Sequence, residues 1–201
     1  MFLTATLSEE ATVLIKKVMV RIAVDQHTRY ANITDILKSF VDTVNVDDGE
    51  LFVHSMHTTC AIVCQEDETQ LLTNDLPRIL ERVAPTSIGR KAMMRENRGA
   101  YYAHDDKDKR TENLVAGEEE RVNGHAHIRA TLVGAPNLQL AIANGNLVLG
   151  TWQSVNLVDF DDQGNPPAKE RNIFIRLISW SEKKPEQSLW FIPFRWPWRR
   201  Q

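Results

Sequence analysis

Polar and apolar residues alternate along the first regularly patterned stretch of the chain. In residues 12–25, TVLIKKVMVRIAVD, β-branched side chains occupy every second position from Val18 to Val24. A period of two predicts a β-strand with one buried face. The next stretch, 32–44, instead places apolar residues three and four positions apart, which predicts a helix.

Strand-like and helix-like patterns recur after a turn at 47–50. Residues 51–65 are mostly apolar and predict either one bulged strand or two strands. Residues 68–83 predict a second helix, which we expect to kink or break at Pro77. The inner face of this helix is predicted to carry Leu71, Leu72, Leu76, Ile79, Leu80 and Val83.

The second half of the chain opens with an irregular segment and continues mainly as strands. Residues 85–122 are charged and weakly periodic and predict a long surface excursion. Residues 123–134 predict a short helix, and the Asn-Gly-Asn at 144–146 predicts a hairpin turn. Segregation of helices and strands favours an α+β fold. The predicted strands are 138–143, 146–152, 154–160 and 172–179.

Composition restricts the class of protein. The 201 residues are 42% hydrophobic and 25% charged, as in a globular chain, with a formal net charge of −3. This charge gives no general attraction to nucleic acid, so no nucleic acid partner is expected. Two cysteines, no apolar run of bilayer length and no signal-peptide pattern predict a cytoplasmic protein. We expect Trp152 in the core.

The last residues, 180–201, differ in texture from the domain predicted at 1–179. They hold four of the five tryptophans together with prolines and arginines, and we interpret them as an appended tail. Tryptophan with arginine suits a lipid–water interface, and aromatic residues with arginine can stack on single-stranded nucleic acid. We favour a third interpretation, an extension that packs along its own domain or stays disordered, because prolines prevent an amphipathic helix.

Candidate chemistry begins in VHSMHTTCAIVCQE, residues 53–66. His54 and His57 are an odd number of positions apart, so in one strand only one of them can face a given site. In the helix at 123–134, His125 and His127 lie about 200° apart, and the small and polar neighbours of His127 favour that residue.

His104, in YYAHDD, adds a third imidazole from a separate element. His57, His104 and His127 together have the layout of an open metal site with a position left for water or substrate. Sequence spacing does not bring them together, so the alternative that each is a structural histidine stays open. No HExxH motif is present.

Other candidate groups flank these histidines. Cys60 and Cys64 share a strand face, and packing is favoured over a nucleophilic thiol. Glu66 and Asp75 are either acid/base groups, carboxylates that orient an imidazole, or solvated surface charges.

Several motifs together resemble one known family. HTTCAIVCQE, Asp75, YYAHDD, NGHAHIRATLVG, NGNLVLGTWQSV and the strand after Arg171 occur in the order and spacing of the YjbQ-like family, over roughly 10–179. Its members are described as secondary thiamine-phosphate synthases. The resemblance implies a compact α+β β-sandwich with two to three helices, assembled as a homotrimer, with metal and anion sites around the histidines.

The resemblance also implies roles for individual positions. It assigns a divalent metal, zinc or similar, to His57, His104 and His127, and catalytic assistance to Glu66 and Asp75. The turn that binds substrate corresponds to Gly150, Thr151, Trp152 and Gln153. Lys169 and Arg171 stand at the two basic positions of the family's phosphate-binding turn, with lysine in place of an arginine there.

The implied function is that of an enzyme similar to thiamine-phosphate synthase. It joins hydroxymethylpyrimidine diphosphate to thiazole phosphate, as a secondary and promiscuous activity, and its partner is a small phosphorylated substrate. Two alternatives stay open: a trimeric metal- or anion-binding protein without turnover, and a metal-dependent phosphate-ester hydrolase.

Overall fold

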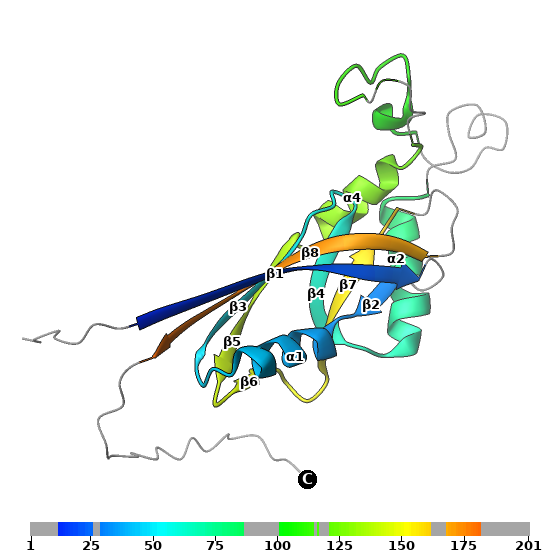
Figure 1. Ribbon diagram of the computed structural model, residues 1–201. Coiled ribbons are helices and arrows are strands. Elements are labelled where there is room, and N and C mark those ends of the chain that lie inside the picture. Colours follow the sequence, from blue (N-terminus) through cyan, green and yellow to red (C-terminus); the bar gives the residue numbers. More distant parts are fainter. Residues whose placement is uncertain are drawn as a thin grey trace, which may run out of the picture.

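Two antiparallel sheets form the body of the protein (Figure 1). The computed structural model describes residues 12–25, 29–86, 101–114, 116, 121–161 and 168–181. The five-stranded sheet has the order β1 (Thr12–Asp25), β8 (Ala168–Ser181), β3 (Gly49–Ser55), β5 (Asn137–Ala143) and β6 (Asn146–Leu147). The three-stranded sheet has the order β2 (Tyr30–Asn32), β7 (Gln153–Asp159) and β4 (Cys60–Glu66). The predicted α+β class is confirmed.

The main core lies between the two sheets. Burial alternates along β3, so Leu51 and Val53 point inward together with alternate residues of β8. Helix α1 (Thr34–Val44) adds Leu37 and Val41 to the same cluster. Since the three-stranded sheet contributes Leu157 and its neighbours, one apolar cluster joins both sheets and α1.

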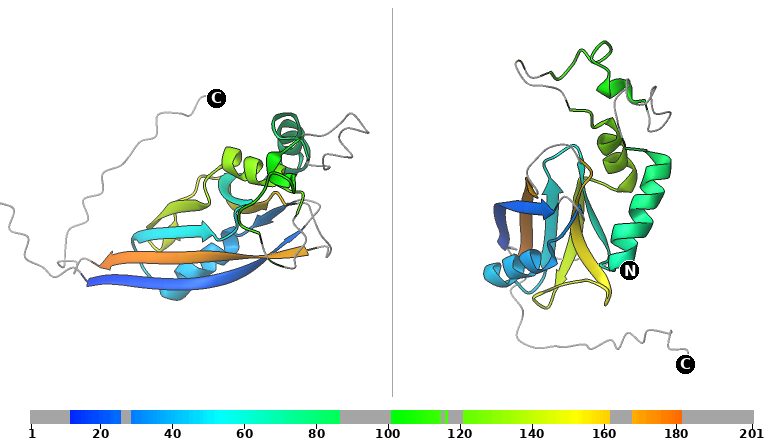
Figure 2. Two further views of the ribbon diagram at one scale, coloured as in Figure 1. Left: turned by 90° about the horizontal axis from the view of Figure 1, so that it is seen from above. Right: turned by 90° about the vertical axis from the view of Figure 1, so that its right-hand side faces the viewer.

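A second apolar layer covers the other face of the three-stranded sheet. Ala61, Val158 and Phe160 pack there against Ala126 and Ala130 of α4 (Gly124–Val133). Helix α2 (Leu76–Val83) lies on this same side, away from β1 and β8 (Figure 2). The layers are therefore the large sheet, the small sheet and the helices α2 and α4.

The stretch 51–65 is two strands rather than one. The chain leaves the five-stranded sheet after Ser55 and enters the three-stranded sheet at Cys60. The four residues between them form an irregular segment and turn, which carries His57. This change of sheet, and not a bulge, interrupts the apolar run.

The helix predicted at 68–83 is irregular, but the irregular segment lies before Pro77 and not at it. A π-helical segment, η1 (Leu71–Asp75), precedes α2, whose first turn contains the proline. The helical conformation is continuous from residue 69 to Val83. Pro77, which has no N–H to donate, comes just after the π segment, where the Leu76 N–H bonds to the Leu71 carbonyl instead of an i−4 carbonyl. The predicted inner face is wrong for Ile79 and Val83, which are 48% and 61% exposed.

Two further predictions in the strand region need correction. The strand expected over 146–152 is only the two residues of β6, followed by an irregular connection to β7. Trp152, expected in the core, is 74% exposed in this connection. The hairpin turn is confirmed, with Asn144 and Gly145 both at positive φ.

The predicted boundaries fall partly outside the described residues. Strand β8 continues to Ser181, two residues past the predicted domain end, and the rest of the tail is not described. Within the predicted excursion, 87–100, 115 and 117–120 are not described, while η2 (Ala103–Asp105) and the buried Asp106 show local packing. No helix within the described ranges is long and apolar enough to cross a bilayer.

Candidate functional site

His57 lies in the segment between β3 and β4, at the end of the five-stranded sheet. Its backbone N–H donates to the Ser55 hydroxyl over 3.4 Å, and its ring Nε2 accepts from the Asn172 N–H over 3.2 Å. Because β3 ends at Ser55, the alternation expected of one strand does not continue to His57. The expectation that only one of His54 and His57 could face a site is therefore wrong, and both line the same cavity.

His104 and His127 are adjacent although they are far apart in sequence. The ring of His104, on η2, and that of His127, on α4, have centroids 4.7 Å apart and a tilt of 48°. His125, on the same helix, is fully buried. The structure thus brings two of the three predicted imidazoles into contact.

Asp105 holds His104 in position. Its Oδ1 lies 3.0 Å from His104 Nδ1 and accepts the Gly124 N–H over 2.8 Å. A Cβ built on Gly124 would meet Tyr102 Cβ at 2.7 Å, so the start of α4 packs directly on residues 101–105. Asp105 was not among the predicted site residues, although an acid directly after a histidine in YYAHDD was a usable signal.

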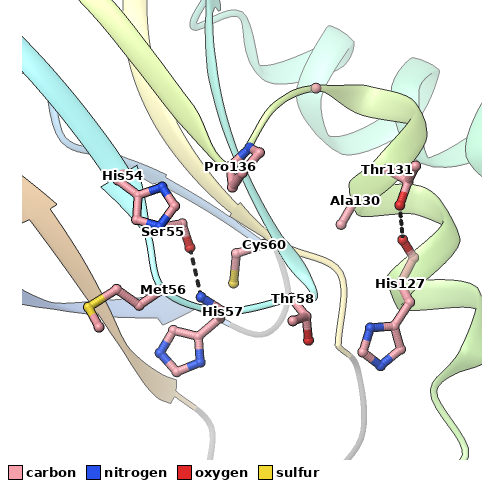
Figure 3. Close-up of a pocket in the computed structure, with 11 residues that line it drawn as sticks. His54, Ser55, Met56, His57, Thr58, Cys60, His127, Ala130, Thr131 and Pro136 are labelled. Atoms are coloured by element: carbon pink, nitrogen blue, oxygen red, sulfur yellow. Dashed lines mark hydrogen bonds between the residues drawn. The ribbon is translucent and has the colours of Figure 1, made fainter.

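An open cavity of about 610 Å³ connects His57 and His127. It is bounded by the end of β3, the following turn and the face of α4 that carries Ala130 and Thr131. Figure 3 shows the rings of His57 and His127 on either side of Thr58, at one margin of this cavity.

The surroundings favour the neutral form of His57 and of His127. Burial lowers the pKa of His57, and the Arg171 cation lowers it further, while Asp159 acts in the opposite direction. Burial also lowers the pKa of His127, aided by electrostatic repulsion from the neighbouring His104 and Arg110 side chains and opposed by Asp161 and by a hydrogen bond with the Thr58 backbone. A neutral imidazole is the form that binds a metal or accepts a proton.

Arg171 belongs to a buried ion-pair group behind His57. Its Nε donates to Asp159 Oδ2 over 2.7 Å, and its terminal nitrogen lies 3.6 Å from Asp161. The Arg171 side chain is only 12% exposed. Its guanidinium is therefore held by carboxylates of its own domain. Lys169 is in the β8 ladder opposite Val24, and its side chain lies outside what the structure describes.

Cys60 is a core residue that also borders the cavity. It is 3% exposed, and burial, with the nearby Asp159 carboxylate, raises the pKa of its thiol to about 12. Cys64 packs against the same core cluster. Both positions agree with packing rather than with a nucleophilic role.

The remaining predicted residues lie at the opposite end of the small sheet. Glu66 pairs with Gln153 across β4 and β7, six residues from Cys60, which is about 20 Å along a strand. Asp75 is exposed and pairs with Arg78 over 2.9 Å. Gln153 Oε1 accepts the Gly150 N–H over 2.7 Å, which closes the turn that contains Thr151. One chain does not bring this group to the histidines.

The three histidines predicted as metal ligands are not assembled into a metal site. Among the residues that the structure describes, no three His, Cys, Asp or Glu side chains stand close enough to hold a metal ion. The chemistry nevertheless fits zinc or a similar ion: two adjacent imidazoles, one with a carboxylate on its other nitrogen, and a third on the shared cavity. His57 must release the Asn172 N–H to bind through Nε2.

A second, polar cavity adjoins His104. It measures about 410 Å³ and is lined by Ala103, Lys109, Arg110, Thr111, Glu112 and Asn113 besides His104. Two cations and several hydrogen-bond donors, set against the one carboxylate of Glu112, suit an anionic group such as phosphate. The His104–His127 pair therefore has a cavity for each ring: one near the His57 turn and one near this basic loop.

The fold and the site together define an antiparallel α+β protein with an open, imidazole-bearing cavity between a strand end and a helix. The family model described as "UPF0047 protein YjbQ-like" matches residues 19–179, and the chain belongs to this family.

Several relatives support this assignment. A UPF0047 protein from Archaeoglobus fulgidus is 31% identical over 129 residues, 64% of this chain and 81% of that protein. The UPF0047 protein YugU from Bacillus subtilis is 25% identical over 130 residues, 65% of this chain and 78% of its own.

Solved structures show the same fold. A crystal structure of an uncharacterized conserved YjbQ/UPF0047 protein from Clostridium acetobutylicum is 26% identical, covers 79% of this chain and 98% of its own, and superposes with a TM-score of 0.52. A YbjQ-like protein of unknown function from Sulfolobus solfataricus is 23% identical, covers 83% and 99%, and has a TM-score of 0.59.

Proposed function

We propose that this protein is a metal-assisted enzyme that acts on a small phosphorylated substrate, with a secondary activity of the thiamine-phosphate synthase type. The observation that carries the proposal is the 4.7 Å contact between His104 and His127 at a cavity that His57 also lines. Imidazoles from three separate elements, with His57 and His127 favoured in the neutral form, are suited to a metal site with a free position.

In this reaction the thiazole nitrogen attacks the methylene carbon of the pyrimidine substrate. A C–N bond forms, the C–O bond to the diphosphate breaks, and pyrophosphate leaves with the electron pair. A divalent ion held by His57, His104 and His127 would supply positive charge next to the leaving diphosphate when bound. Lys109 and Arg110, which line the cavity at His104, are suited to hold phosphate oxygens.

Asp105 and Arg171 act on the histidines rather than on the substrate. The Asp105 carboxylate at Nδ1 leaves His104 Nε2 available to the site. The Arg171 cation, fixed by Asp159, disfavours protonation of His57 and keeps this imidazole available as a ligand or base. Both are positioning residues in the proposal.

Glu66, Asp75 and the turn at 150–153 enter the proposal through assembly. Glu66 is about 20 Å along β4 from Cys60, at the end of the strand away from the His57 turn, yet the resemblance implies a homotrimer. The 74% exposure of Trp152 would be reduced if the turn met a neighbouring subunit. We therefore place these residues at a neighbour's cavity, so that each site is shared between two subunits.

The test combines metal content with activity. Purified protein is assayed with the two thiamine precursors before and after chelation, and bound metal is measured by mass spectrometry. His57→Ala, His104→Ala and His127→Ala are each expected to lose most of the bound metal. His54→Ala is the matched control, because His54 lines the same cavity but belongs to the strand, and this variant should keep its metal.

The outcomes separate the candidate functions. Product formation that chelation abolishes supports the proposal, whereas bound metal without turnover supports a binding protein. Activity on a panel of phosphate esters, but not on the precursors, would instead support a metal-dependent hydrolase. Equal loss of metal in the His54 variant would contradict the assignment of the ligands.

A further inference from the structure

The five-stranded sheet has an apolar face that no described helix covers. We call it the outer face, the side turned away from the three-stranded sheet. Inward residues such as Leu51 and Leu177 are fully buried, while the side chains between them point outward. The described helices pack elsewhere, α1 on β6 and β7 and α4 on β4. Figure 2 shows β1 and β8 on the opposite side of the molecule from α2 and α4.

Large apolar side chains form two groups on this face, separated by the row of Lys17 and Arg176. The antiparallel register places Val13 beside Trp180 and Ile15 beside Ile178 in one group, and Met19 beside Phe174 in the other. Exposure reaches 55% for Val13, 51% for Ile15, 53% for Met19 and 44% for Trp180. Exposed apolar side chains of this size on one face of a folded protein indicate a contact surface.

A chain segment that is suited to cover this face is attached directly to its end. Residues 182–201, EKKPEQSLWFIPFRWPWRRQ, follow directly on β8, whose Trp180 belongs to the outer face. Six of the first seven residues, 182–188, are polar or charged and the seventh is Pro185, whereas seven of the ten residues from 189 to 198 are apolar or aromatic. A polar spacer followed by an apolar stretch can turn back and cover the sheet to which it is joined.

The lengths match. From Trp180 to Phe174, the two apolar groups extend about 20 Å along β8, at roughly 3.3 Å per residue. The ten residues 189–198 reach about 33 Å when extended, and the seven-residue spacer is long enough to reverse direction. The covalent link also gives this segment a much higher effective concentration at the face than any free partner has.

The prolines decide how the segment binds. Pro193 and Pro197 have no amide hydrogen and cannot extend a regular ladder along the free edge of β1. Side-chain contact across the face is the remaining mode. The family match ends at residue 179, so residues 182–201 lie beyond the matched domain.

We propose that residues 182–201 fold back over the outer face of the five-stranded sheet, with the aromatic side chains of 190–198 packed on Ile15, Met19 and Trp180. The occupant is a segment of the same chain. A second copy or a membrane is an alternative outcome of the test.

Two methionines provide a matched internal probe. Met19, on the outer face, is 53% exposed in the described structure, and Met56, beside the His57 turn, is 55% exposed. Hydrogen peroxide transfers one oxygen to an accessible methionine sulfur. If residues 182–201 cover the face, Met19 of the intact protein is oxidised roughly tenfold more slowly than Met56, because oxidation must await opening.

A variant within the segment completes the test. In the full chain carrying Trp190→Ser and Trp196→Ser, Met19 and Met56 are expected to be oxidised at similar rates. Similar rates already in the unaltered protein would overturn the proposal. So would protection of Met19 that survives in the variant, since this assigns the face to a second copy, or protection that arises only with added phospholipid vesicles.

Proteolysis tests the same contact from the sheet side. Ile15→Glu places a charge on the outer face, and trypsin should then cleave after Arg195 roughly tenfold faster than in the unaltered protein. Ile79→Glu is the control, at 48% exposure on α2. Equal cleavage rates in all three proteins would contradict the proposal even if the tail variant failed to fold.

Discussion

Three features of its surroundings affect the pKa of His127. Its ring is half-buried, it contacts His104, and cations lie nearby, so its pKa is held below the ordinary 6.5. Neither ring is a separate unit, because protonation of one raises the cost of protonating the other. Their close contact therefore makes the proton affinity of each depend on the other.

This coupling can be measured by NMR titration of the imidazole signals. His127 should titrate below pH 6.5, and His104→Gln should move its pKa upward, because the repulsion from a protonated His104 is removed. His54→Gln should leave it unchanged. An unchanged pKa in the His104 variant would mean that the contact does not carry the effect. His127 is therefore protonated on the acidic side of pH 6.5, where it loses the nitrogen lone pair that could bind a metal.

Sequence reasoning proposed the three imidazoles but not the residues that contact them. Helix geometry separates His127 from His125, and motif order singles out His57 and His104, so the choice of residues needed no coordinates. The contacts of Asp105 and of the Asn172 N–H with these histidines could not be predicted, because they depend on how η2 and β8 end near the cavity. The Arg171–Asp159 ion pair could not be predicted either, because an arginine in a strand is equally suited to bind a phosphate or an internal carboxylate.

At the scale of elements, α4 is joined to α2 by one buried arginine. Arg129 is 5% exposed, and its Nε donates to the Ala84 carbonyl over 2.8 Å, while its terminal nitrogen pairs with Glu81. This contact fixes the end of α2 against the helix that carries His127.

Arg129→Met should lower the free energy of unfolding by about 2–3 kcal/mol, since charged hydrogen bonds to Ala84 and Glu81 are lost from a largely buried site. Denaturation in urea measures the change. Arg78→Met is the matched control. Its pair with Asp75 is exposed on both sides and should contribute less than about 1 kcal/mol. Equal effects would show that burial of the Arg129 pair does not matter.

Gly124 sets the distance between α4 and η2. In Gly124→Ala the added methyl would lie 2.7 Å from Tyr102 Cβ, so residues 101–105 must move, and His104 with them. We expect the variant to stay folded by far-ultraviolet circular dichroism and to lose bound metal. Gly134→Ala is the control, because its nearest contact is an ordinary 3.7 Å. Full metal content in Gly124→Ala would contradict this placement of His104.

Elements with strong local signals could be predicted, and those fixed by tertiary context could not. Periodicity located α1 and the strand at 12–25, and the Asn-Gly turn located the hairpin before β6. The π segment before α2 has no period that marks it. The three residues of β2 are too few to produce a pattern, and they pair as a strand because β7 offers a partner.

At the scale of the whole molecule, the described chain leaves the Trp152 turn and the outer face exposed. The implied homotrimer and the proposed cover by residues 182–201 concern these two separate surfaces. The exposure of these two surfaces was not predicted from the sequence. For Trp152, burial depends on what the turn contacts and not on the composition of the turn.

Sedimentation at micromolar concentration should give a mass near three times 23.0 kDa. Trp152→Ala should lower this mass, since the proposal places the turn at a subunit contact. Val83→Ala is the control, an apolar residue 61% exposed on α2. A mass near 23.0 kDa for the unaltered protein would contradict the trimer and, with it, the shared site.

The pairing of β1 with β8 has a consequence during synthesis. These strands are the first and last of the described elements, yet they pair along all of their length. The nascent chain therefore exposes an apolar strand near its beginning until almost the entire domain has left the ribosome. Because the two strands are so far apart in sequence, the five-stranded sheet is completed late and slowly. Until β8 has been synthesised, β1 is the kind of exposed apolar segment that a ribosome-associated chaperone binds.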